Sequence, residues 1–313
     1  MKASWKRLLS EQTMPLALLA IWLFFGLEQP LFLSSRNLSL LLIELSVTAS
    51  LALGMLLVLL PGQIDLSAGS GLGLAGALAA VLVFWHGVPA PLALLVAGVV
   101  CVAVWAAMGA LIVRQRIPAF IITLGGLLVF KGLHWLTIHN QTVPIAEGGK
   151  SNAYSLLTTY YVSPAVGYVL AALVVAGFVL STLRARARRV AHGFPVADGE
   201  RVFLGLFVTA QLVFLLPVVT NQYRGVPLPA LILGALSLAV HVLTAHTPFG
   251  RYLYAIGSNE EAALISGVLF GALIMASLLN GMTLMAVAPE VKLIARGVVL
   301  ALAVWVDVKL NSE

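Results

Sequence analysis

Apolar residues occur along this chain in long runs that short polar stretches separate. A helix that crosses the hydrocarbon core of a bilayer needs about 20 mostly apolar residues. Ten runs approach this length, and we expect spanning helices near residues 14–33, 39–60, 66–85, 91–113, 119–138, 164–182, 202–220, 226–244, 268–285 and 292–309. The pattern predicts an all-α fold: a polytopic transmembrane helical bundle of about ten spans that forms one domain over residues 1–313.

The composition agrees with this pattern. Hydrophobic residues make up 61% of the 313 residues and charged residues only 10%, whereas a soluble domain carries about 25% charged residues. A soluble core of this size could not bury so much apolar surface, so we expect a multi-pass protein surrounded by a lipid bilayer. The single cysteine, Cys101, lies inside an apolar run, which excludes a disulfide or a thiolate cluster within the chain.

Positive charge gathers in alternate loops, which predicts an orientation. Lys2, Lys6 and Arg7 place the N-terminus in the cytoplasm by the positive-inside rule. We interpret the run after them as a retained first span, because it is of spanning length and no small-residue cleavage site follows. Alternation then places most other cations inside: Arg114, Arg116, Arg184, Arg186, Arg188, Arg189, Arg201, Arg251 and Lys309. The net charge of +6 therefore follows from topology and does not indicate nucleic acid. Segment 139–163 becomes the main external excursion.

The stretch 250–267 is one of the few polar islands long enough to act outside a bilayer, and the predicted topology places it in the cytoplasm. Ser258 followed by Glu261 matches a capping box at a helix start, and Gly267 matches a residue that stops a helix. The spacing predicts a helix of about eight residues. Isolated helices this short are marginal in water, so we expect this one to be held by packing against its own protein or a partner.

The stretch 61–70, Pro61-Gly-Gln-Ile-Asp-Leu-Ser-Ala-Gly-Ser70, interrupts the apolar pattern between the second and third predicted spans. Proline and glycine free backbone groups there, and these need protein or water around them if they lie at membrane depth. Asp65 has two interpretations at this point: a cap for the following helix, or a residue that lines a pathway through the membrane.

Motifs for catalysis or cofactor binding do not occur in this sequence. Gly148-Gly-Lys-Ser151 resembles the end of a phosphate-binding loop, but Pro144 stands where that motif requires glycine. The six histidines show no ligand spacing, and no pair of carboxylates shares a helix face. We therefore expect no catalytic residue, metal site or cofactor in this chain.

Several motifs, in this order, resemble the permease subunits of bacterial ATP-binding-cassette importers for ribose, galactose, arabinose and xylose. They cover nearly the whole chain: Ile64-Asp-Leu-Ser-Ala-Gly-Ser70, Ile117-Pro-Ala-Phe-Ile-Ile-Thr-Leu-Gly125, Tyr223-Arg-Gly-Val-Pro227, Gly250-Arg-Tyr-Leu-Tyr-Ala-Ile-Gly-Ser-Asn259 with Ala262-Ala-Leu-Ile-Ser-Gly267, and Gly271-Ala-Leu-Ile-Met-Ala-Ser-Leu-Leu-Asn-Gly281. The basic linker 184–201, the apolar pair after it and the motif 223–227 resemble the xylose permeases most.

This resemblance implies a permease domain without its own ATPase site, a homodimer in the bacterial inner membrane. It implies three partners: a second copy of the permease, a periplasmic sugar-binding protein, and a cytoplasmic ATPase subunit that binds ATP and Mg. The family's coupling segment corresponds to residues Ala255, Gly257, Ser258, Asn259, Glu261, Ala262, Ala263, Leu264, Ile265 and Gly267. Neutral sugars need hydrogen-bond partners without strong charge, and the candidate pathway residues are Asp65, Ser67, Ser70, Thr123 and Asn280.

The chain departs from the family pattern after Gly267, where Val268-Leu-Phe-Gly271 joins the coupling segment directly to a late helix. The family carries tens of further residues there. Either the chain has a real internal deletion, or a segment of the natural protein between residues 267 and 268 is missing from this sequence. We favour the second interpretation, because losing part of a translocation bundle should impair its packing.

These observations predict an ATP-driven importer subunit for a monosaccharide, with a pentose such as xylose as substrate. A different class remains open on the residues alone: a proton-coupled secondary transporter that uses Glu44 or Asp65, since acids at membrane depth are functional candidates.

Overall fold

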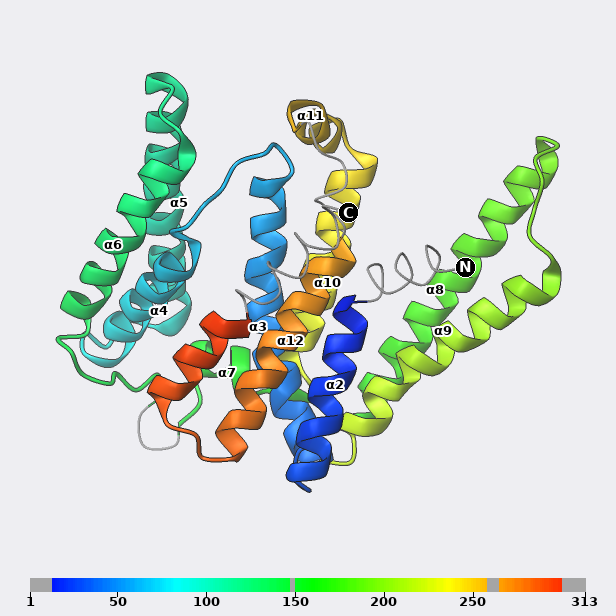
Figure 1. The fold of residues 1–313 in the computed structure, drawn as a ribbon, viewed down its shortest axis with the longest axis horizontal. Helices are drawn as coiled ribbons and strands as arrows, with labels where there is room; N and C mark the ends of the chain where they lie inside the picture. Colours follow the sequence, from blue (N-terminus) through cyan, green and yellow to red (C-terminus); the bar gives the residue numbers. More distant parts are fainter. Residues whose placement is uncertain (1–12, 147–149, 258–264, 300–313) are drawn as a thin grey trace.

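The computed structural model describes residues 13–146, 150–257 and 265–299, and this part of the chain is almost entirely helical (Figure 1). The helices are α2 (Thr13–Glu28), α3 (Ser35–Leu59), α4 (Ala68–Phe84), α5 (Ala90–Gln115), α6 (Ala119–Thr137), α7 (Ala153–Thr159), α8 (Pro164–Ala191), α9 (Gly199–Thr220), α10 (Leu228–His246), α11 (Pro248–Ile256) and α12 (Ile265–Leu284). Residues 289–299 are also helical. Two short strands, β1 (Tyr161–Val162) and β2 (Val226–Pro227), pair in an antiparallel manner.

The helices form three groups around a central helix, α3 (Figure 1). α4, α5 and α6 pack together on one side, α8 and α9 form a hairpin on the other, and α3 packs against α10 and α12, with α2 packed against α12. α11 lies at one end of this arrangement, beyond the last turn of α3, and α7 lies toward the other end. We refer to these as the α11 end and the α7 end.

α3 can occupy the centre because its packed faces carry apolar and small residues. Leu41, Ala49 and Leu53 are buried. Ser39 and Ser46 are buried too, and each hydroxyl donates to the carbonyl four residues earlier, at 2.8 Å and 2.6 Å. Small side chains let neighbouring helices approach closely in a membrane, and the local hydrogen bonds leave these two hydroxyls satisfied.

The all-α, multi-pass prediction is confirmed. Each of the first nine predicted spans coincides with a helix, and the described part of the tenth is helical. Six described helices are long and apolar enough to cross a membrane: α3, α5, α6, α8, α9 and α10. α2, α4 and the apolar part of α12 are shorter. The count of ten spans and the cytoplasmic N-terminus stay predictions.

Two helices, α2 and α4, are shorter than the predicted spans. α2 ends at Glu28, and Pro30 follows, which cannot donate to a helical hydrogen bond. α4 has 17 residues, about 25 Å at the helical rise, so it is shorter than a hydrocarbon core of about 30 Å. In Figure 1 the segment between α3 and α4 runs extended alongside α5 and α6 before α4 begins.

The motif 223–227 has a structural role at the α7 end. Gly225 has a φ of +109°, and an added Cβ there would lie 2.0 Å from the carbonyl oxygen of Val162. Glycine therefore permits β2 to pair with β1, which ties the start of α10 to the start of α8.

A second contact at the α7 end joins α7 to α4. The Tyr154 hydroxyl of α7 donates to the carbonyl of Gly76 at 3.2 Å, and burial raises the pKa of this tyrosine, which keeps the donor protonated.

The prediction for residues 250–267 needs correction. A nine-residue helix, α11, precedes the predicted one: the Thr247 hydroxyl accepts the Gly250 N–H at 3.3 Å, and Pro248 occupies the first turn. Gly267 does not end a helix but lies inside α12, because the apolar run after it continues the helix without a stop signal. Ser258, Asn259, Glu261, Ala262, Ala263 and Leu264 lie outside the described residues.

A buried polar pair links α3 to α12, and its removal tests this packing. The Asn37 amide donates to the Asn280 side-chain oxygen and to the Phe32 carbonyl, both at 2.8 Å. We expect Asn37→Ala to lower the free energy of unfolding in detergent by about 1–2 kcal/mol, because a buried acceptor loses its donor. Thr48→Ala, at an exposed position on the same helix, should change it by less than about 0.5 kcal/mol. Equal effects of the two variants would contradict the proposed role of the pair.

Candidate translocation cleft

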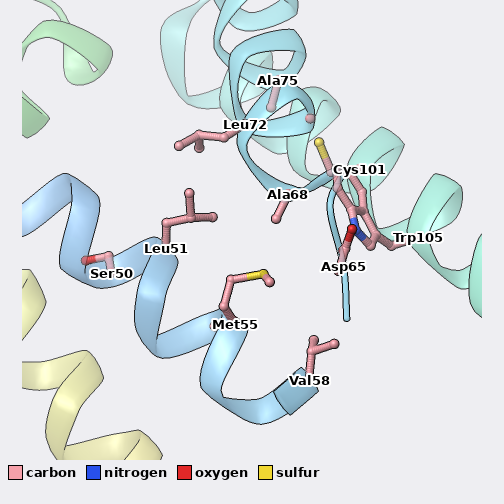
Figure 2. A pocket seen from close by; sticks show the side chains of 12 residues that line it. Ser50, Leu51, Met55, Val58, Asp65, Ala68, Leu72, Ala75, Cys101 and Trp105 are labelled. Atoms are coloured by element: carbon pink, nitrogen blue, oxygen red, sulfur yellow. The ribbon is translucent and has the colours of Figure 1, made fainter. Parts of the chain in front are cut away.

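A cleft runs along one face of α3, formed by two adjoining hollows. The first, of about 350 Å³, lies between α3, the segment before α4, α4 itself and α5 (Figure 2). The second, of about 480 Å³, lies between α3, α4, α7 and α10. Ser50, Leu51 and Leu72 line both hollows, so we treat the two as one feature, the α3 cleft. Pockets for small molecules begin at about 300 Å³, so either hollow has room for one.

The walls of the α3 cleft are mostly apolar, with a few polar groups. In Figure 2 Leu51, Met55 and Val58 of α3 face Ala68 and Leu72 of α4. Ser46, Ser50 and Thr158 supply hydroxyls, and among the described lining residues only Asp65 carries a charge. Such a lining offers scattered hydrogen-bond partners to a neutral polar solute. It has no paired positive and negative side chains, among the described lining residues, that could bind a charged solute.

Asp65 organises the segment that closes one end of the cleft. Its Oδ1 accepts the Ser67 N–H at 2.7 Å and the Ser67 hydroxyl at 2.5 Å, while its Oδ2 accepts the Trp105 indole N–H at 2.9 Å. Figure 2 shows the carboxylate against the indole of Trp105. Asp65 therefore stabilises the start of α4 and fastens it to α5, and it also lines the cleft. The structure corrects one of the two interpretations from the sequence: the N-cap residue of α4 is Ser67, and Asp65 accepts the Ser67 N–H rather than an N–H of the helix, whereas its place in the lining of the cleft is as expected.

Further hydrogen bonds satisfy the extended backbone around residues 61–67. The Thr123 hydroxyl of α6 donates to the Ile64 carbonyl at 3.2 Å, and the Ser70 hydroxyl donates to the Ser67 carbonyl at 2.9 Å. Irregular backbone at membrane depth requires partners of this kind. Four candidate pathway residues are thus brought together, namely Asp65, Ser67, Ser70 and Thr123.

These four residues do not have equal access to the cleft. Ser67 and Thr123 are buried, with 0% and 4% of their surface exposed, and only Asp65 contributes to the described lining. Ser67 and Thr123 therefore support the wall. Asn280 lies apart from the group, buried against Asn37 and outside both hollows; a role for it in a pathway stays a prediction.

The structure adds residues that the sequence did not single out. Trp105 packs against Gly71, where an added Cβ would lie 1.9 Å from the indole ring, and its ring centroid is 5.1 Å from that of Phe130. Ser50, Met55 and Cys101 also line the cleft. One signal was available: the indole N–H of a tryptophan within an apolar span needs an acceptor, and Asp65 is the nearest acid in sequence to Trp105.

Four residues of the predicted coupling segment lie in the described part of the chain. Ala255 belongs to the last turn of α11 and Gly257 follows it, while Ile265 and Gly267 belong to the first turn of α12. Glu44, the other acid proposed for proton coupling, is exposed on α3 and does not line either hollow.

Comparisons with known proteins assign a family. Residues 37–288 match a family model described as "Branched-chain amino acid transport system / permease component". The xylose transport system permease protein XylH of Escherichia coli is 32% identical over 93% of this chain and 90% of its own length. XylH of Haemophilus influenzae is 30% identical over 94% and 95%, and the L-arabinose ABC transporter permease protein AraH of Azospirillum brasilense is 31% identical over 96% and 88%.

The xylose permease alignment extends over 356 positions although this chain has 313 residues, so the relative carries residues that this chain lacks. This difference in length is what a missing segment would produce. Its position between residues 267 and 268 stays a prediction. No solved structure matches the chain significantly. The breadth of these alignments, together with the membrane-spanning helices and the cleft between them, shows that the chain belongs to the permease family of ABC importers, alongside sugar permeases of the xylose, ribose and arabinose type.

Proposed function

We propose that this chain is the membrane subunit of an ATP-driven importer for a monosaccharide, with a pentose such as xylose as its substrate. The observation that carries the proposal is similarity to two xylose permeases over at least 90% of both chains in each alignment. Sugar would pass from a periplasmic binding protein to the cytoplasm through a permease homodimer in the inner membrane. A cytoplasmic ATPase subunit would supply the energy.

The lining of the α3 cleft favours a sugar over an amino acid, although the family description names branched-chain amino acids. A free amino acid carries an ammonium and a carboxylate, and each is costly to desolvate without an opposite charge. Among the described lining residues, only Asp65 is charged, and three hydrogen bonds already engage its carboxylate. A neutral sugar would need only the scattered hydroxyls and backbone groups.

The same geometry disfavours proton coupling. A proton carrier has to exchange its proton with the pathway, yet Glu44 lies outside the cleft. Asp65 is held as an acceptor by Ser67 and Trp105, and protonation would weaken those bonds. The named relatives are transport-system permeases and not secondary transporters. A proton-coupled mechanism is therefore disfavoured.

Uptake by reconstituted protein tests the proposal. The permease, its cognate ATPase and its binding protein are placed in liposomes, and uptake of radiolabelled xylose, arabinose, ribose, glucose and leucine is measured with and without ATP. We expect ATP-dependent uptake of one or more pentoses and none of leucine. Uptake driven by a pH gradient without the ATPase, or ATP-dependent uptake of leucine alone, would contradict the proposal.

A substitution at Gly71 tests whether the Asp65–Trp105 wall matters for transport. Gly71→Ala places a methyl group where the Trp105 indole lies, so the indole has to move away from Asp65. Overpacking of this kind costs about 1–3 kcal/mol, and we expect sugar uptake to fall at least about tenfold while the protein still assembles with its ATPase. Gly69→Ala, on the same helix with open space around the position, is the matched control. Similar uptake by the two variants would show that the Asp65–Trp105 contact is not needed for transport.

A further inference from the structure

We propose that α11 controls the α11 end of the α3 cleft directly, through a backbone contact between Gly257 and Leu60 that makes α11 and the last turn of α3 move together. The inference rests on the proposed function, since it assigns a control element to the same cleft. It identifies Gly257 as a positioning residue that acts through α3, a route separate from the helices that α11 joins in sequence.

α11 has one face packed into the protein and another face that the described residues leave exposed. Leu253 is buried in an apolar cluster with Leu53, Leu56 and Leu60 of α3 and Val240 of α10. Phe249, Tyr252 and Ile256 follow at helical spacing on the exposed side, with 50%, 66% and 68% of their surface accessible. A force applied to the exposed face is therefore received by a helix whose other face is fixed to α3 and α10.

Gly257, directly after α11, and Leu60, directly after α3, approach each other closely through backbone atoms. An added Cβ at Gly257 would lie 1.8 Å from the Leu60 carbonyl oxygen and 3.2 Å from the Pro61 Cα. Gly257 has a φ of −84° and a ψ of 120°, which any residue adopts. Close approach to Leu60 is thus the reason for glycine at this position. Because this contact is between backbone atoms, no change of side-chain rotamer can relieve it when α11 is pressed toward α3, so such a displacement is transmitted to Leu60.

Leu60 is the last residue before the segment that closes the cleft. Pro61 and Gly62 follow, and the N–H groups of Gly62 and Gln63 donate back to the Leu59 and Val58 carbonyls at 2.8 Å and 3.2 Å. These bonds make the turn stiff. Asp65, with its bonds to Ser67 and Trp105, stands only five residues beyond Leu60. A shift of α11 would therefore reach the wall of the cleft along a short, hydrogen-bonded path.

Sugar uptake per ATP hydrolysed is the decisive readout, because a loss of folding alone does not change this ratio selectively. In the reconstituted complex, Gly257→Ala should keep ATPase association and ATP hydrolysis while the ratio falls about tenfold, since the methyl group forces α11 off Leu60. Gly205→Ala, where the Cβ meets open space, should keep the wild-type ratio. A wild-type ratio in Gly257→Ala would overturn the proposal, whereas absent uptake by the wild-type complex would overturn the proposed function instead.

A cross-link tests the same claim without depending on how Gly257→Ala folds. Leu60→Cys with Leu253→Cys places two thiols in one buried cluster. A short bis-methanethiosulfonate can join them, since each thiol displaces a methanesulfinate and forms a disulfide that a reductant cleaves. If α11 and the end of α3 move as one unit, the cross-linked complex should keep its uptake within about twofold of the same double variant before cross-linking. Each single variant treated with the reagent controls for reaction at Cys101. Uptake that is lost on cross-linking and returns on reductive cleavage of the link would overturn the proposal.

Discussion

The structure depends on the three hydrogen bonds that the Asp65 carboxylate accepts from the Ser67 backbone, the Ser67 hydroxyl and the Trp105 indole. An extended segment inside a helical membrane bundle exposes backbone groups that lipid cannot satisfy. Asp65, together with the Thr123 hydroxyl on the Ile64 carbonyl, makes such a segment tolerable beside α5 and α6. Because helix α4 begins only after that segment, a cleft remains between α4 and α3.

The α3 cleft extends between the α7 end and the α11 end of the molecule. At the α7 end, α7 and the first turns of α10 close around the second hollow. At the α11 end, the cleft ends at Asp65 and the turn after α3, against which α11 packs through Gly257 and Leu253. A transporter must alternate access from one side to the other. At the α11 end, a displacement of α11 and the last turn of α3 would reach the cleft through the short segment between Leu60 and Asp65.

The sequence alone predicted the features that depend on composition and length. Apolar runs located the helices, and Pro61 with Gly62 marked the interruption before α4. Contacts between distant residues could not be predicted from spacing. The need of the Trp105 indole for an acceptor was the one signal toward Asp65, and no sequence pattern links Gly257 to Leu60. The error at Gly267 has the same origin. A glycine after a polar stretch suits a helix end, but the apolar residues that follow it extend α12 instead.

The central claim, that sugar occupies the α3 cleft, can be measured at Cys101, the single cysteine of the sequence, which lines the first hollow. The rate at which a small hydrophilic thiol reagent modifies Cys101 is followed in the reconstituted complex during ATP turnover. A saturating concentration of the transported sugar should slow the modification several-fold, and a sugar that is not transported should leave the rate unchanged. Equal rates with and without the transported sugar would contradict the claim.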